Sequence, residues 1–134
     1  LPTKLPLVIR DAVTVAKRLE ILYLWVDRYC IDQTNETELA AQIKLINLIY
    51  GCTLVTIFAA AGEGPEHGLP GITKGRDEYR QPCAKIGDQL FSWTMPSAPE
   101  LVAKSKWNTR GWTYQEIVFS KSQLILTDDQ AFLE

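Results

Sequence analysis

Two segments of the chain place apolar residues with the period of an amphipathic helix. The first begins at Pro6, whose missing N–H costs nothing in a first helical turn. The apolar side chains of this segment are Ile9, Ala12, Val13, Ala16 and Leu19. This spacing predicts a helix over about 6–20 with one apolar face directed at a core.

The second helical segment reads NETELAAQIKLINLIYG and covers 35–51. One of its faces carries Leu39, Ile43, Ile46 and either Ile49 or Tyr50. Asn35 followed by Glu38 has the spacing of a capping box, and Gly51 suits the left-handed position after a last turn. We therefore expect a second helix between these two ends.

Continuous apolar runs lie on either side of the second helix. ILYLWV, which contains Leu22–Val26, is too short for a helix, and TLVTIFAA at 53–60 is rich in β-branched residues. Such runs are typical of strands covered on both faces of a parallel sheet. Strand, helix and strand in succession predict a βαβ unit with a right-handed crossover.

The middle of the chain is less regular. GEGPEHGLPGITKG, residues 62–75, is dense in glycine and proline and predicts a long surface loop. It lacks the G-K-[ST] ending of a P-loop and the spacing of a dinucleotide fingerprint. Residues 76–100 give no clear pattern, apart from a short strand near Leu90–Trp93.

Regular elements return near the end. A helix is predicted over about 110–119, with Asn108 or Thr109 as its cap. QLILT is expected to form a third buried strand, and Asp128 with Asp129 a turn. QAFLE then either begins another strand or ends the chain irregularly.

Composition narrows the class of protein. The 134 residues fit one domain, 1–134, and the net charge of −2 comes from interspersed acidic and basic residues, without the basic stripe of a nucleic-acid binder. No apolar run approaches the length of a membrane span. Cys30, Cys52 and Cys83 are far apart and odd in number, which favours a reducing, cytoplasmic setting over a disulfide framework. Because the chain starts LPTKLPLVIR, we expect an excerpt of a longer protein.

Asp27 and Asp32 directly follow the first predicted strand. Ligands of open parallel sheets bind beyond the carboxyl ends of the strands, so both carboxylates are candidates for catalysis or binding. The alternative, which we favour, is structural. Asp27 would then accept N–H groups in a tight turn, and Asp32 or Asn35 would help to start the next helix.

Few other residues are candidates for catalysis or metal binding. Cys30 lacks an evident base, because the only histidine, His67, lies in the glycine-rich segment; a buried, inert thiol is the simpler interpretation. The presence of a single histidine also argues against a Ser-His-Asp triad and against a zinc site.

The late segment RGWTYQE combines charge with large aromatic side chains. Arg110 and Glu116 could pair with each other or with the region of Asp27 and Asp32. The indoles of Trp107 and Trp112 need hydrogen-bond partners if they are buried. A buried Glu116 would also need a partner, and its pKa could be shifted.

Three separated stretches resemble the heterokaryon incompatibility (HET) domain of filamentous fungi. They are LYLWVDRYCIDQ, LIYGCTLVTIFAAAGEGPEHGLPGI and SKWNTRGWTYQEIVFSKSQLIL, which agree with the family in order, spacing and residues. The resemblance runs from about Leu5 to Asp129. Positions that match its motifs are Trp25, Asp27, Cys30, Asp32, Gln33, Arg110, Trp112, Gln115 and Glu116. The family often has leucine at the position of Tyr114.

The resemblance implies a role in fungal allorecognition, in which HET proteins trigger programmed cell death after unlike hyphae fuse. It also implies a fold like that of the Toll/interleukin-1 receptor (TIR) domain. This is an open, mostly parallel, flavodoxin-like α/β sheet with flanking helices. The family usually begins with a strand that ends in an S-x-x-W-G type motif, and this chain starts after it, so the first strand is expected to be missing.

Two hypotheses about function follow. In the first, the domain is an interaction module that associates with itself and with other protein domains, needs no cofactor and uses the motif residues to fix its fold. In the second, it is a TIR-like NAD glycohydrolase or another nucleotide-processing enzyme, with Glu116 as the catalytic carboxylate and Asp27 or Asp32 in support. The second rests on fold-level analogy, and we favour the first.

Overall fold

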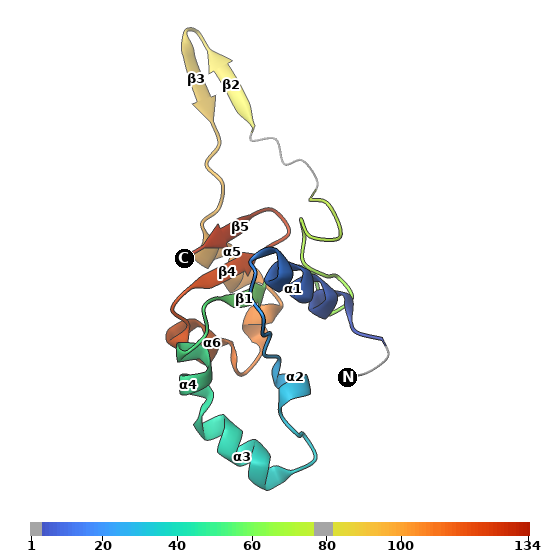
Figure 1. Ribbon diagram of the computed structural model, residues 1–134. Helices are drawn as coiled ribbons and strands as arrows, with labels where there is room; N and C mark the ends of the chain where they lie inside the picture. Colours follow the sequence, from blue (N-terminus) through green and yellow to red (C-terminus); the bar gives the residue numbers. More distant parts are fainter. Residues whose placement is uncertain (1–3, 77–81) are drawn as a thin grey trace.

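The computed structural model describes residues 4–76 and 82–134. It is a mixed α/β structure in which helices flank open sheets that are partly parallel (Figure 1). The main sheet contains β1 (Thr56–Ala59), β4 (Gln123–Leu126) and β5 (Ala131–Leu133) in the order β1-β4-β5. β1 and β4 are parallel, whereas β4 and β5 are antiparallel.

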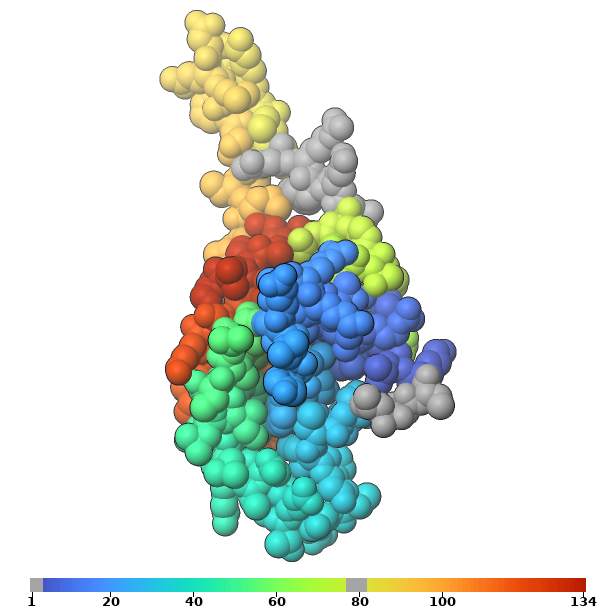
Figure 2. All heavy atoms as spheres, viewed as in Figure 1, coloured from blue at the N-terminus to red at the C-terminus, as the bar shows by residue number. Residues whose placement is uncertain are grey.

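A separate antiparallel hairpin contains β2 (Cys83–Ile86) and β3 (Gln89–Ser92). It projects from the body of the molecule (Figure 2), and every residue of both strands is exposed. Of the three strand pairings in the described residues, one is parallel, so the expectation of a mostly parallel sheet is not met there.

Side-chain alternation along β1 and β4 divides the core into two layers. Phe58 and Ile125 belong to the cluster on one face, which α5 (Ala98–Lys104) and the 3₁₀ helix η1 (Trp107–Thr109) cover. Ile57 packs on the opposite face, in the cluster to which α1 (Leu7–Arg18) contributes Ala12 and Val15. Because successive strand residues point to opposite faces, both faces of this short sheet are buried.

Most of the predicted elements are present. The first helix is α1, and the strands predicted at 53–60 and at QLILT are β1 and β4. The residues of the second predicted helix form α3 (Glu36–Lys44) and α4 (Ile46–Gly51), separated at Leu45. The Asn35 side chain accepts from Glu38 N at 3.1 Å and so caps α3 as predicted.

The predicted strand Leu22–Val26 is wrong. The segment is extended at Val26, where φ is −136° and ψ is 118°, but no described strand pairs with it. A strand is defined by the ladder that it shares with a neighbour, so an apolar run alone cannot specify one. The βαβ unit that this strand would have begun is therefore not formed.

The predicted helix ends near Gly51 and Thr109 also need correction. Gly51 is the last residue of α4 and does not have a positive φ; the chain leaves the helix at Cys52 with φ −98°. Asn108 and Thr109 do not cap α6 (Thr113–Phe119), because their side chains donate to earlier carbonyls, those of Ala103 and Lys106.

Helix α5 was not predicted, although its start has a recognisable pattern. The sequence Ser97-Ala-Pro-Glu100 places a Glu three residues after a Ser, and the Glu100 carboxylate accepts from Ser97 N at 3.0 Å. Pro99 lies in the first turn, where it is tolerated.

A buried carboxylate joins α1 to the glycine-rich loop at 62–75. Asp11 is 1% exposed and accepts hydrogen bonds from Leu69 N, at 2.7 Å, and from the Thr73 hydroxyl. Further along the loop, His67 Nε2 lies 2.8 Å from Asp128 Oδ1, beyond the end of β4. The loop is therefore held against both α1 and the sheet.

We expect Asp11→Ala to lower the free energy of unfolding by about 2–3 kcal/mol, because it leaves a buried N–H and a hydroxyl without their acceptor. Urea unfolding measures the change. Arg10→Ala, one residue earlier on the exposed side of α1, is the control and should cost under about 0.5 kcal/mol. Equal losses in the two variants would contradict a special role for Asp11.

Candidate functional site

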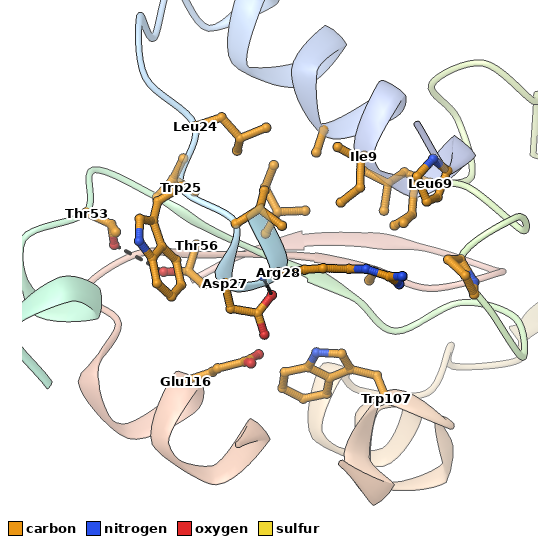
Figure 3. Close-up of a pocket in the computed structure, with 18 of the residues that line it drawn as sticks. Ile9, Leu24, Trp25, Asp27, Arg28, Thr53, Thr56, Leu69, Trp107 and Glu116 are labelled. Atoms are coloured by element: carbon orange, nitrogen blue, oxygen red, sulfur yellow. Dashed lines mark hydrogen bonds between the residues drawn. The ribbon is translucent and has the colours of Figure 1, made fainter. Parts of the chain in front are cut away.

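A cavity of about 1140 Å³ lies between residues 21–26 and β1 (Figure 3). The start of α1 and the loop residues from Gly62 to Pro65 form two of its sides. Polar groups gather at one end, where Asp27, Arg110 and Glu116 line it together with Trp107. The remaining lining is mostly apolar, as in pockets that bind small molecules or peptide segments.

Glu116 is the most deeply buried charged side chain of this cluster, at 8% exposure. It lies in α6, and Figure 3 shows its carboxyl group directed toward Asp27 and Trp107. Burial raises the pKa of Glu116 above its ordinary value. The negative charge of Asp27 acts in the same direction, whereas Arg110 and hydrogen bonds from Tyr50 and Trp107 oppose it.

Tyr50 reaches this carboxyl group from α4. Burial raises the pKa of the Tyr50 phenol, and the negative charge of Glu116 raises it further. The hydroxyl therefore stays protonated and remains a hydrogen-bond donor to Glu116. The Tyr50 ring also contacts Trp25 edge to face, with ring centroids 5.9 Å apart.

Asp27 makes a local hydrogen bond and also lines the cavity. Its Oδ1 accepts from Arg28 N at 2.7 Å at the start of the short helix α2 (Asp27–Cys30), which is a local structural role. Its Oδ2 lies 4.0 Å from Arg110 Nη2, with both side chains about half exposed. This exposed ion pair is weak. The carboxyl groups of Asp27 and Glu116 point toward each other (Figure 3).

Asp32 does not join the site. It is exposed, and its Oδ1 accepts from both the backbone N–H and the hydroxyl of Thr34, at 2.9 and 2.7 Å. These hydrogen bonds lower the pKa of Asp32. Of the three carboxylates, Asp27 and Glu116 therefore meet at the cavity and Asp32 does not. Asp32 closes a local turn with Thr34, and of the two residues considered for the start of the next helix it is Asn35 that caps α3.

The neighbouring motif residues stabilise the corner around α2. Cys30 is exposed rather than buried as predicted, and its Sγ accepts from Val26 N at 3.4 Å. Gln33 donates from Nε2 to the carbonyl oxygens of Asp27 and Ile31, at 3.4 Å each. His67 is paired with Asp128, and no hydrogen bond links it to Cys30.

The late motif residues lie in different surroundings. Trp107 is buried and stacks on Phe58, with centroids 4.7 Å apart, whereas Trp112 is 40% exposed at the start of α6. The Gln115 side-chain oxygen is buried and has no hydrogen-bond partner in the part of the chain that the structure describes.

Sequence reasoning missed Tyr50 as a partner of Glu116. The helical pattern placed it on a core face, and nothing in that pattern separates a packing tyrosine from one that meets a carboxyl group. It also missed the hydroxyl pair beside the cavity, where the Thr53 and Thr56 oxygens lie 3.1 Å apart. The approach of α4 to α6 brings Tyr50 to Glu116, and this contact between distant segments has no local signal in the sequence.

The site can hold polar groups at the end of an apolar cavity. It offers the carboxyl groups of Asp27 and Glu116, the guanidinium of Arg110 and two aromatic walls, Trp25 and Trp107. Among residues 4–76 and 82–134 no group of three or more His, Cys, Asp or Glu could hold a metal ion. No helix in these ranges is long and apolar enough to cross a membrane.

Fold and cavity together define a mixed α/β domain with a buried carboxyl site. The family model for the heterokaryon incompatibility protein (HET) matches residues 1–116, which is most of the chain. The chain therefore belongs to the HET family. No curated protein and no solved structure matches it.

The raised pKa of Glu116 predicts a pH-dependent cost. The carboxyl group has its ordinary pKa of 4.5 when unfolded, so its contribution to stability is present below that pH and is lost as pH rises through the higher folded-state pKa. Glu116→Gln removes this loss. The free energy of unfolding of the variant relative to the parent should therefore increase between about pH 4 and pH 8.

Urea unfolding across that pH range measures the difference. Asp32→Asn is an opposite control, because hydrogen bonds lower the pKa of Asp32 below 3.8, and its contribution is lost as pH falls. Parallel pH profiles for the Glu116→Gln protein and its parent would contradict the assignment.

Proposed function

We propose that this HET domain acts in non-self recognition as an interaction module, which associates with further copies or with other protein domains and so triggers programmed cell death. The family is implicated in fungal heterokaryon incompatibility. The observation that carries the proposal is the exposure of large apolar side chains on two adjacent helices, α4 and α6.

Leu48 on α4 is 58% exposed and Val118 on α6 is 54% exposed. The two helices pack against each other, and a side chain at Gly51 would lie 4.0 Å from the Phe119 carbonyl oxygen. Leu45, next to α4, and Tyr114 and Phe119 of α6 are exposed as well. Clustered apolar side chains that are accessible to water are typical of protein–protein interfaces.

Other features are consistent with this role. Net charge is −2 without a basic stripe, which argues against nucleic acid as the partner. Cys30 and Cys52 are free thiols, which is in keeping with the proposed reducing, cytoplasmic setting. A sheet with parallel β1 and β4, covered by helices on both faces, supports a TIR- or flavodoxin-like fold as part of the proposal.

We expect Leu48→Glu and Val118→Glu to weaken self-association by about tenfold or more, because each places a charge in an apolar contact. Sedimentation velocity measures association, and hyphal death after expression measures function. Asn47→Glu adds the same charge to an exposed polar position of α4 and is the control. If the two variants fold, associate and kill like the parent, this surface is not the interface.

A second candidate function is NAD glycohydrolysis, or processing of another nucleotide. It is favoured by the meeting of Asp27 and Glu116 at the end of a cavity with aromatic walls. In such a reaction water replaces nicotinamide at the ribosyl carbon, and a carboxylate stabilises the positive charge that develops there. Glu116 would supply that carboxylate, with Asp27 beside it.

The enzyme hypothesis predicts nicotinamide release when the associated protein is incubated with NAD. Glu116→Gln should slow the release by about a hundredfold or more, as removal of a charge-stabilising group does. Asp32→Asn should leave the rate unchanged, because Asp32 lies outside the cavity. Absence of release from folded, associated protein would exclude this function for NAD.

A further inference from the structure

Three aromatic rings line the polar end of the cavity. Glu116 accepts hydrogen bonds from Tyr50 and Trp107, which both line the cavity beside it. The Tyr50 ring in turn contacts the Trp25 ring edge to face. Figure 3 shows the two indole rings on opposite sides of the carboxyl groups of Asp27 and Glu116. Because aromatic faces carry partial negative charge, this end of the cavity combines two carboxyl groups with rings that also attract cations.

Arg110 only partly balances the two carboxyl groups. Its guanidinium lies 4.0 Å from the Asp27 carboxylate, and both side chains are about half exposed, so this ion pair is weak. Figure 3 shows the guanidinium of Arg28 directed away from Asp27 and Glu116. Burial raises the pKa of Glu116, and the charge of Asp27 raises it further, as expected for a carboxyl group whose charge is incompletely compensated.

Beyond the polar end, the cavity continues along apolar side chains. Ile9 and Ala12 of α1 line it, together with Leu24 and with Ile57 of β1. Its volume of about 1140 Å³ is sufficient to enclose most of a small organic molecule. A ligand that complements both regions therefore has a positive group at one end and an apolar body.

We propose that the cavity binds a small organic cation, an amine whose ammonium group lies beside Asp27 and Glu116 and whose apolar body contacts Leu24 and Ile57. The ammonium group donates hydrogen bonds to the two carboxylates and is attracted by the neighbouring aromatic rings. This is a binding site only, without a reaction. It depends neither on the α4–α6 surface nor on NAD turnover, so it stands if either of those functions fails.

Other ligand chemistries fit the same end of the cavity less well. A neutral apolar molecule would exclude water from the two carboxyl groups without supplying donors in its place. An anion would be repelled by Asp27 and Glu116, with the half-exposed Arg110 as its counter-ion. Arg110 also competes with an ammonium group for Asp27, so removal of its charge should strengthen the binding of a cation.

Three probes with the same apolar body and different charges test the proposal. At neutral pH phenylbutylamine is a cation, phenylbutanol is neutral and phenylbutyrate is an anion. Isothermal titration calorimetry with the full chain measures the Kd of each. We expect the amine to bind about tenfold or more tightly than the alcohol, because charge-assisted hydrogen bonds are the stronger ones. The anion should bind more weakly than the alcohol.

Charge-removing variants locate the ammonium group. Glu116→Gln should weaken amine binding by about tenfold and leave alcohol binding nearly unchanged, which also reports that the variant is folded. Asp27→Asn is a second variant with the same expectation. Asp32→Asn removes an equal charge outside the cavity and is the control.

Arg110→Gln should change the affinity in the opposite direction and strengthen amine binding severalfold. Lys106→Gln is its matched control, because it removes the same charge from a lining residue outside the ion pair with Asp27. Its effect on the amine should be the smaller of the two.

The outcomes decide the proposal in either direction. A preference for the amine that is lost in Glu116→Gln or Asp27→Asn, and kept in Asp32→Asn, supports it. Equal affinities for amine and alcohol overturn it, because the cavity then takes apolar molecules without regard to charge. Tightest binding of the anion, or no binding of any probe, overturns it as well. An equal loss in Asp32→Asn also does so, since the preference would then reflect only the overall charge of the protein.

Discussion

The buried carboxylate of Asp11 is the contact on which the arrangement around the cavity depends. A carboxylate at 1% exposure is tolerated only with strong donors, and Leu69 N and the Thr73 hydroxyl supply them. Both donors belong to the glycine-rich loop, so one side chain of α1 fixes helix and loop together. Gly68 must remain glycine, because its φ is +81° and a Cβ there would lie 2.6 Å from Asp11 Oδ2.

This attachment explains how a large cavity persists beside β1. Asp11 holds α1 on one face of the sheet, and the loop that it fixes forms one side of the cavity. On the other face, the contact between Trp25 and Tyr50 holds residues 21–26 against α4. The extended segment is thus restrained at both faces and does not close onto the open edge of β1. The exposed Leu22 and Tyr23 are the consequence.

The hydrophobic periodicity correctly predicted elements that need only an apolar surface to pack against. It failed for a segment whose structure depends on a specific neighbouring strand. α1, β1 and β4 bury regular apolar faces, and any complementary surface satisfies them. Leu22–Val26 has the composition of a strand, but a ladder needs a neighbour that no local pattern can reveal. The Asp32 side chain accepts hydrogen bonds from Thr34, two residues away. The sequence alone does not decide between such a local turn and a role in the cavity. For Glu116, the need for a partner was predictable, and its identity as Tyr50 was not.

The protonation state of Glu116 depends on how far its surroundings exclude water. Glu116 owes its raised pKa first to burial, and part of its surroundings is the open cavity. Any uncharged molecule that excludes water from the cavity would bury this carboxyl group further and raise its pKa again. The lower local dielectric would also strengthen the attraction of Arg110, which favours the charged form. The balance between these two effects decides whether Glu116 in the occupied cavity is a neutral hydrogen-bond donor or a carboxylate. Only a carboxylate could stabilise a ribosyl cation, so the enzyme hypothesis requires Arg110, Tyr50 and Trp107 to outweigh the added burial.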